Sequence, residues 1–254
     1  MNILVCVKRV PAPGARISVR PDGLAVDTAF LGFTTSPHEE CAVEAAVQIA
    51  ERHGGTTTVL TVGPPAAEEQ LRYAASVGVN SVVLVPTDGS DWDPQRTARA
   101  IVLAAGELEA ESPFDLIVFG NESADAGGFQ VGVRVARALG RPMINGAKSL
   151  EVTDVVATVE RESDAGRVVF TVPLPAVVGV KEGINLPRYP TMKGRLASKK
   201  VTVTTIEPTA SAGGQSLVTL VTPPEVMTST TVLGIGPDAA PAVADLLTEI
   251  GVLK

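Results

Sequence analysis

The sequence is poor in the residues that disulfide frameworks, metal centres and nucleic-acid interfaces require. Among its 254 residues are only two cysteines, Cys6 and Cys41, and only two histidines. So few cysteines imply no disulfide framework and favour a reducing compartment. The formal net charge of -7 at pH 7 argues against nucleic acid as a partner, because its phosphates would be repelled.

Long apolar runs and targeting segments are also missing. No run reaches the length needed to span a bilayer, and the first residues form a strand-like run rather than a signal or transit peptide. We therefore expect a soluble protein without direct membrane insertion, cytoplasmic if the source is bacterial. Hydrophobic residues make up 45% of the chain, which suffices for one large domain with a sizeable core.

Strand-like apolar runs alternate with helical periodicity up to residue 140. The runs typical of strands are 2–7, 56–62, 81–85 and 116–119, and the expected helices are 36–52, 66–76, 93–109 and 131–139. This alternation predicts a doubly wound, mainly parallel α/β sheet with right-handed crossovers and helices on both faces. The sheet order would begin 3-2-1-4, and the carboxyl ends of the first and fourth runs would flank the ligand crevice.

The first helix has the clearest start signal in the sequence. Ser36 is placed to cap it, Pro37 suits its first position, and Glu39 completes a capping box three residues after Ser36. Gly54 and Gly55 are expected to end this helix.

The stretch 116–140 contains the main candidate site. Gly120 ends an apolar strand where a bulky side chain would be in the way, and Gly127 and Gly128 lead into a helix. A phosphate-bearing ligand is favoured at such a strand-loop-helix junction, because free backbone N–H groups at the helix start attract it. The spacing matches neither the P-loop nor the dinucleotide fingerprint, so a plain strand-to-helix turn remains an alternative. We call residues 120–130 the glycine loop.

The remaining segments are less regular. We expect a small hairpin over 17–26, β-rich segments over 148–158 and 167–172 with a polar turn at 163–166, and a short strand over 176–180. The sequence also predicts an extended loop over 187–200, a flexible joint over 211–215, and a C-terminal part with a strand-like piece and a helix. That helix has an apolar stripe of Val243, Leu246, Leu247 and Ile250, which needs its own domain or a partner subunit to cover it.

Other candidate sites are weaker. The stretch 234–239 resembles a dinucleotide fingerprint, but too little chain follows it for the second strand and its acidic residue. His38, Glu39 and Cys41 could approach one another on a helix, but no second ligand pair is present, so we expect no metal. No arrangement of serine, cysteine and histidine indicates hydrolysis, and the sequence indicates a binding protein rather than a catalyst.

Six stretches together resemble one family, the beta (small) subunit of electron-transfer flavoproteins. They are ILVCVKRV, SPHEECAVEAA, EEQLRYAASVGVNSVVLV, GNESADAGGFQVG, LPAVVGVKEGINLPRYPTMKGRLASKK and ADLLTEIGVL, spread over nearly the whole chain in the family's order. The resemblance implies a Rossmann-like fold of the adenine-nucleotide-binding type. It divides the chain into a nucleotide-binding domain, residues 1–200, and a C-terminal arm and helix, residues 201–254, that pack on the partner.

The resemblance also implies cofactors and partners. This subunit would form a heterodimer with an alpha subunit that holds most of the redox-active FAD, and would itself bind a structural AMP. The heterodimer would accept electrons from flavin-dependent dehydrogenases and pass them on, with a membrane quinone oxidoreductase as a possible acceptor. The flavin does the chemistry, while the protein supplies position and electrostatics.

Family positions carried over onto this sequence give two sets of residues. The cofactor-binding set is Cys6, Lys8, Ser36, Pro37, His38, Glu39, Val62, Gly120, Asn121, Glu122, Ser123, Ala124, Asp125, Ala126, Gly127, Gly128, Phe129, Gln130 and Val131. Within it Asp125 would contact the ribose or shape the loop, and the amides around Gly127 to Gln130 would bind phosphate. The partner-binding set, an expected dehydrogenase-recognition loop with Ile184 as its exposed apolar anchor, is Gly183, Ile184, Asn185, Leu186, Pro187, Arg188 and Tyr189.

Two alternatives stay open at this point. The loop has fewer carboxylates than the family commonly shows, which leaves room for a second FAD in place of AMP, as in electron-bifurcating relatives. A stand-alone adenine-nucleotide sensor resembling universal stress proteins would share the fold, but it would have no use for the segments after residue 176.

Overall fold

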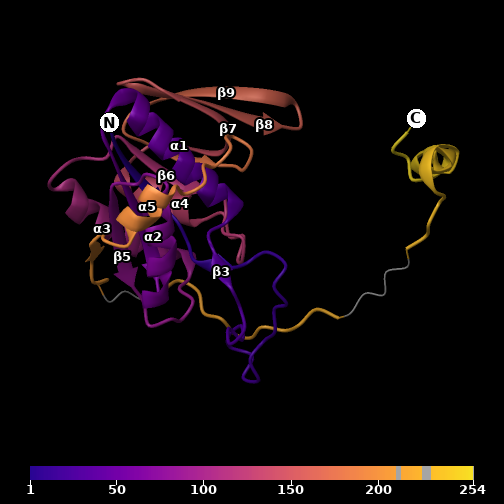
Figure 1. The fold of residues 1–254 in the computed structure, drawn as a ribbon, viewed down its shortest axis with the longest axis horizontal. Helices are drawn as coiled ribbons and strands as arrows, with labels where there is room; N and C mark the ends of the chain where they lie inside the picture. The colour runs from indigo at the N-terminus through magenta and orange to yellow at the C-terminus, as the bar shows by residue number, and fades with distance from the viewer. Residues whose placement is uncertain (210–212, 225–229, 254) are drawn as a thin grey trace.

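The computed structural model describes residues 1–209, 213–224 and 230–253. Within these residues one large sheet has the strands β1 (Asn2–Cys6), β4 (Thr56–Gly63), β5 (Ser81–Pro86), β6 (Leu116–Gly120), β7 (Met143–Val152), β8 (Val156–Ser163), β9 (Gly166–Pro173), β10 (Ala176–Val180) and β11 (Val203–Thr205). Their spatial order is β11-β5-β4-β1-β6-β10-β7-β8-β9 (Figure 1). The predicted order 3-2-1-4 corresponds to β5-β4-β1-β6 and is confirmed, with every neighbouring pair parallel.

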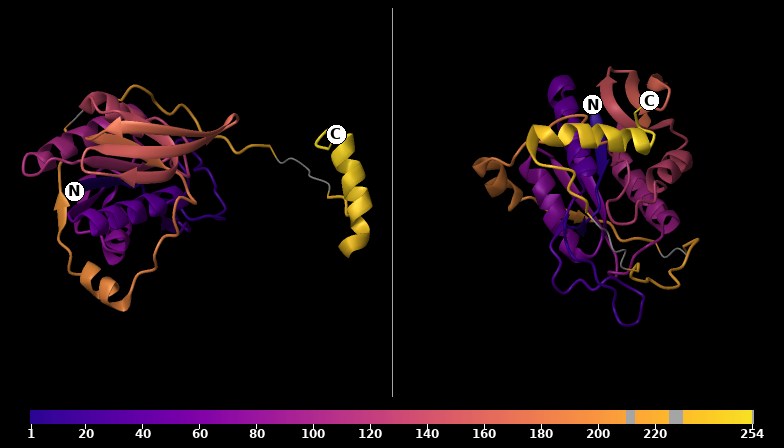
Figure 2. Two further views of the ribbon diagram at one scale, coloured as in Figure 1. Left: turned by 90° about the horizontal axis from the view of Figure 1, so that it is seen from above. Right: turned by 90° about the vertical axis from the view of Figure 1, so that its right-hand side faces the viewer.

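Helices cover both faces of this sheet, as the alternation of elements predicts (Figures 1 and 2). In the described parts of the chain they are α1 (Pro37–His53), α2 (Glu68–Ser76), α3 (Pro94–Glu109), α4 (Val131–Leu139), α5 (Met192–Ser198) and α6 (Ala240–Glu249), with the short 3-10 turns η1 (Pro65–Ala67) and η2 (Gly236–Ala239). The four helices predicted before residue 140 are confirmed, with small differences at their ends.

Strand β1 shows how the sequence builds two cores. Its side chains alternate between the two faces, so Ile3 and Val5 pack with α1 and α2, while Leu4 and Cys6 pack with α3 and α4. Both faces are apolar because both are covered, as is usual for central parallel strands. Because neither face of β1 is open to solvent, a ligand can reach this strand only at its carboxyl end.

The start of α1 follows the predicted capping box. The Ser36 hydroxyl accepts a hydrogen bond from the Glu39 N–H at 3.3 Å, and the Glu39 carboxylate accepts one from the Ser36 N–H at 2.9 Å. Gly54, with a φ of 68°, stands directly after the helix. Since such a φ is strained for residues with a side chain, glycine at this position favours the helix end found here.

The second half of the sheet has a different topology. The β-rich segment 148–158 contains parts of two antiparallel strands, β7 and β8, and β8 pairs with β9 around the predicted polar turn. The predicted strand 176–180 is confirmed as β10. It returns to lie between β6 and β7, parallel to both.

The prediction of an extended loop over 187–200 was wrong for its second part. Thr191 caps α5, its hydroxyl accepting a hydrogen bond from the Gly194 N–H at 3.0 Å. A side chain at Gly194 would lie 2.2 Å from the carbonyl oxygen of Ser76, so glycine lets α5 pack closely beside α2. The predicted hairpin over 17–26 is reduced to one isolated bridge between Val19 and Val26. Two short strands nearby, β2 (Val10–Pro11) and β3 (Phe33–Thr34), form a separate antiparallel pair.

The C-terminal segments lie along the domain and then leave it. The predicted joint 211–215 falls partly outside the described residues, but the Gln215 N–H donates to Asp93 at 3.3 Å and the Leu220 N–H donates to Gly23 at 2.7 Å. The strand-like piece expected after residue 217 is not a strand in residues 217–224 or 230–235. Helix α6 forms as predicted, has no buried residue and stands away from the sheet (Figures 1 and 2).

Candidate functional site

The candidate site lies where neighbouring parallel strands end. Strands β1 and β6 pair through Cys6 and Phe119, so the segment after β1 and the glycine loop leave the same edge of the sheet. The first turn of α1 faces the same edge. The structure therefore brings together the three segments that the sequence assigned to one site, and we call the space between them the crevice.

Glu39 fastens two of these segments to each other. Its side chain is only 5% exposed, and its two oxygens accept hydrogen bonds from the N–H groups of Lys8 at 2.7 Å and Ser36 at 2.9 Å. Burial raises the pKa of this carboxyl to about 7, although the hydrogen bonds from Ser36 and Lys8 act in the opposite direction. Glu39 is a titratable group at neutral pH in the wall of the site.

Gly120 permits the close approach of β6 to the start of α1. A side-chain carbon at this position would lie 2.7 Å from the Glu39 Cγ and 3.3 Å from the His38 Cβ. Both distances are too short for non-bonded carbon atoms. The sequence argument that a bulky side chain would be in the way here has its physical reason in this contact.

An ion pair links the segment after β1 to the glycine loop. The Lys8 ammonium lies 2.6 Å from an oxygen of Asp125, whose other oxygen accepts a hydrogen bond from the Ala126 N–H at 2.7 Å. Partial burial would raise the pKa of Asp125, but Lys8 and the Ala126 N–H outweigh it and hold this pKa below its usual range. These two contacts hold Asp125 between Lys8 and the backbone of its own loop.

The glycine loop presents backbone donors next to α4. The Gly127 N–H is already used, since it donates to the Ser123 carbonyl at 2.9 Å. The first N–H groups of α4 have no acceptor within a helix and carry partial positive charge. The donors that remain for a phosphate group are therefore those that follow Gly127, close to Gln130 and Val131.

His38 joins the glycine loop to the segment after β10. Its Nδ1 accepts a hydrogen bond from the Glu182 N–H at 2.8 Å, and its Nε2 lies 3.3 Å from a carboxylate oxygen of Glu122. Glu122 also accepts a hydrogen bond from the Asn121 side chain. With Nδ1 accepting, the imidazole proton belongs on Nε2, facing Glu122.

Two expected contact residues are recessed into the strands. Cys6 is 5% exposed, and burial raises the pKa of its thiol, with the Glu39 charge adding to the effect. Such a thiol stays protonated and unreactive, as is usual for a cysteine buried in a core. Val62, near the end of β4, is partly buried against the core formed with α3 and α4.

The expected partner-binding loop, which we call the docking loop (residues 183–189), is held to α1. The Asn185 side chain donates to the Cys41 carbonyl at 2.9 Å. The expected exposure of Ile184 was wrong, because it is partly buried and packs against the core. The exposed apolar side chains are Leu186, 87% exposed, and Tyr189, 89% exposed.

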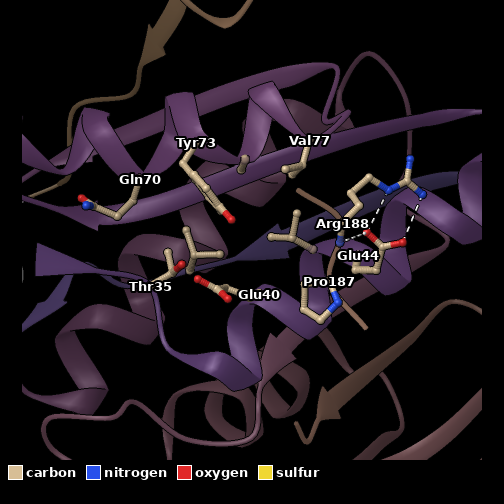
Figure 3. A pocket seen from close by; sticks show the side chains of 11 residues that line it. Thr35, Glu40, Glu44, Gln70, Tyr73, Val77, Pro187 and Arg188 are labelled. Atoms are coloured by element: carbon tan, nitrogen blue, oxygen red, sulfur yellow. Dashed lines mark hydrogen bonds and ion pairs between the residues drawn. The ribbon is translucent and has the colours of Figure 1, made fainter. Parts of the chain in front are cut away.

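Arg188 is committed to its own chain. Its guanidinium lies 2.9 Å from Glu44, which is almost fully buried (Figure 3). It also lies 2.7 Å from Glu51. Figure 3 shows Arg188 and Pro187 at one end of a small hollow between α1 and α2, with Tyr73 on its opposite wall. The hollow encloses about 10 Å³, room for a single water molecule at most.

A larger cavity of about 240 Å³ adjoins the glycine loop on the side of β7 and β10. Its cationic residues, Lys148, Arg161 and Lys181, were not identified from the sequence. They come from three segments whose adjacency depends on the return of β10 to the middle of the sheet. No local spacing in the sequence signals that return.

The described residues contain neither a candidate membrane span nor a candidate metal-binding cluster. None of their helices is long and apolar enough to cross a membrane, and nowhere among them do three potential His, Cys, Asp or Glu ligands gather around one point.

Comparison with known proteins adds an independent line of evidence. The family model for the electron transfer flavoprotein domain matches residues 24–211. A relative from Syntrophomonas wolfei named electron transfer flavoprotein subunit beta is 35% identical over 225 residues, covering 88% of this chain and 86% of that protein. Proteins of the same name from Mycobacterium leprae and Bacillus subtilis are 36% and 34% identical, covering 81% and 79% of this chain and 78% and 76% of their own lengths.

Proposed function

This chain belongs to the electron transfer flavoprotein family as a beta subunit, part of an electron carrier and not an enzyme, and we propose that its crevice binds a structural AMP. The observation that carries the proposal is the convergence of the segment after β1, the start of α1 and the glycine loop at one edge of the sheet. Family membership also removes the reason to consider a stand-alone nucleotide sensor.

The charges and donors of the crevice fit a nucleotide monophosphate. The N–H groups at the start of α4 suit the phosphate, and the Lys8 ammonium supplies the positive charge at the mouth. Asp125 pairs with Lys8 and can also accept a hydrogen bond from a ribose hydroxyl. The adenine would lie deeper, toward Cys6 and Val62, where the strand ends are apolar and buried.

The FAD of the complex is proposed to lie in a site shared with the alpha subunit, where it supplies the redox chemistry. The proposed division into a domain of residues 1–200 and an arm of residues 201–254 makes β11 the point at which the arm leaves the sheet. The stripe of α6 would then pack on the alpha subunit. A cytoplasmic location is part of the same proposal.

The docking loop is proposed to contact flavin-dependent dehydrogenases that donate electrons, with a quinone oxidoreductase as a possible acceptor. Leu186 and Tyr189 support this role, because both project from a loop that Asn185 and Arg188 hold in place. Since Ile184 packs inward, Leu186 takes its place as the proposed apolar anchor. Leu186→Ala should slow electron uptake from a dehydrogenase without loss of flavin, whereas unchanged transfer kinetics would remove this assignment.

The experiment that tests the nucleotide is direct. We would co-express this chain with its alpha subunit, denature the purified complex and quantify the released nucleotides by chromatography. One FAD and one AMP per heterodimer is the expected result, and two FAD without AMP would replace AMP by a second flavin. Lys8→Met should lower the AMP content, while Lys193→Met, which removes an exposed charge on α5, should not. A complex without AMP or a second FAD would refute the crevice as a nucleotide site.

A further inference from the structure

The wall of the cavity beside the glycine loop carries more positive than negative side chains. Lys148 on β7, Arg161 on β8 and Lys181 after β10 line it, against a single carboxylate, Glu162. Within the described residues none of the three cations lies at ion-pair distance from a carboxylate. A concave surface of one sign concentrates the electrostatic field, so this cavity attracts anions. We call it the basic cavity.

The cations stand on a braced wall. The Lys148 ammonium donates a hydrogen bond to the Glu182 carbonyl at 2.8 Å. The Glu182 N–H in turn donates one to His38 at 2.8 Å. The segment that begins at Lys181 is thereby tied both to β7 and to the start of α1. A positive group that is held before binding, as the Lys148 ammonium is, loses little conformational freedom when a ligand arrives.

The opposite wall belongs to the glycine loop. Asn121 and Phe129 line the basic cavity, and Phe129 has a φ of 53°, the only positive φ of a residue with a side chain in the described parts of the chain. A bulky residue in this conformation costs on the order of 1–3 kcal/mol. Such strain is found most often at binding sites, and here it fixes the edge of the cavity.

The basic cavity is open to solvent on one side and has room for a small ligand. Its volume of about 240 Å³ is many times the roughly 10–15 Å³ that one water molecule needs on the same measure, and it lies below the roughly 300–1,000 Å³ of sites for drug-sized ligands. A compact oxyanion with several acceptor oxygens fits both the size and the charge. Phosphate and diphosphate groups are of this kind, and lysine and arginine are their usual partners.

We propose that the basic cavity is a second oxyanion site that takes a phosphate or diphosphate group. It lies on the β7 and β10 side of the glycine loop, whereas the crevice lies on the β1 side, so the inference does not rest on the nucleotide proposed for the crevice. The group belongs either to a free small anion or to a larger cofactor of the complex.

Calorimetric titration of the purified complex in phosphate-free buffer tests the proposal, with inorganic phosphate and pyrophosphate as probes. Arg161→Met and Lys181→Met should each weaken binding about tenfold, as expected for the loss of one charge-assisted hydrogen bond. Arg167→Met is the matched control, because Arg167 is an exposed cation on β9 outside the cavity, and it should leave binding unchanged. Nucleotide content, measured after denaturation, should stay the same in all three variants.

The flavin-loaded and flavin-free complexes distinguish the two sources of the group. Binding to both forms identifies a site for a free anion, and binding to the flavin-free form alone identifies a site for a cofactor phosphate. The absence of saturable binding in both forms would overturn the proposal. The three cations would then be assigned to ion pairs with carboxylates of a partner chain. Equal weakening by Arg167→Met would also overturn it, because the effect would then be one of net charge.

Discussion

Replacing Glu39 with glutamine should remove a loss of stability that the wild type suffers as the pH rises through neutrality. The carboxyl is buried, and its pKa rises from 4.5 to about 7. Because the folded state holds the proton more tightly than the unfolded chain, the stabilisation linked to Glu39 is complete below pH 4.5 and is lost as the pH rises through 7. Glutamine does not ionise, but only its one amide oxygen can accept a hydrogen bond, so one of the two bonds from the N–H groups of Lys8 and Ser36 is lost in the variant.

The magnitude follows from the shift in pKa. At 1.36 kcal/mol for each pKa unit, ionisation of Glu39 removes about 3 kcal/mol of unfolding free energy by pH 8. The two hydrogen bonds that the carboxylate accepts are already part of this balance. Glu39→Gln should therefore be less stable than the wild type at pH 4.5 by about 1–3 kcal/mol, the cost of one unsatisfied buried N–H, and this difference should shift in favour of the variant by about 3 kcal/mol between pH 4.5 and pH 8.

Thermal unfolding of the purified complex, at fixed concentration and a series of pH values, measures this effect. For a chain of this length about 3 kcal/mol corresponds to roughly 6–12 °C in Tm. The difference between variant and wild type removes the contribution of every other titrating group. A difference between variant and wild type that stays the same at all pH values would refute the reasoning, because folding would then not change the pKa of Glu39.

Three further substitutions test the contacts around the site. Gly120→Ala should lower the unfolding free energy by about 1–3 kcal/mol, because its new carbon would lie 2.7 Å from the Glu39 Cγ. Gly106→Ala is the control, since this position in α3 has open space around it and the change should be neutral or stabilising. An equal Tm for the two variants would show that the contact with Glu39 does not matter. Arg188→Met should lower the unfolding free energy by about 1–2 kcal/mol, because it breaks an ion pair with the buried Glu44, and the partial exposure of Arg188 reduces this cost. The same change should speed hydrogen exchange in the docking loop. Unchanged exchange would show that the ion pairs do not hold the loop in place. Thr191→Ala should cost about 1 kcal/mol and speed exchange in α5, with rescue by serine; an equal loss in the serine variant would exclude the cap as the cause.

Local signals in the sequence sufficed for the part of the fold that holds the crevice. The capping box at Ser36 and Glu39 fixed the start of α1, and the alternation of strands and helices fixed the order of the four strands around β1. Both depend on residues close together in the chain or on the handedness of βαβ units. The prediction that Gly120 ends an apolar strand followed from the same pattern, whereas its contact with the start of α1 did not.

Features that depend on distant packing were not predictable from the sequence. The return of β10 between β6 and β7 leaves no trace in the periodicity of residues 176–180, and it creates the wall that Lys181 shares with β7. The inward position of Ile184 depends in the same way on a distant contact, that of Asn185 with α1. The cap at Thr191 was the one local signal that was available and missed, because nearby prolines and basic residues favoured a loop.

The glycine loop lies between the crevice and the basic cavity and contributes residues to the walls of both. On the β1 side Asp125 holds Lys8 across the mouth of the crevice, and on the β7 side Asn121 and Phe129 line the basic cavity. Glu122 lies between them, paired with His38. A ligand that moved the loop toward one side would change the other side as well, since these residues share one short segment. Occupation of one site should therefore change the affinity of the other, whereas variants whose basic cavity stays empty keep their nucleotide content.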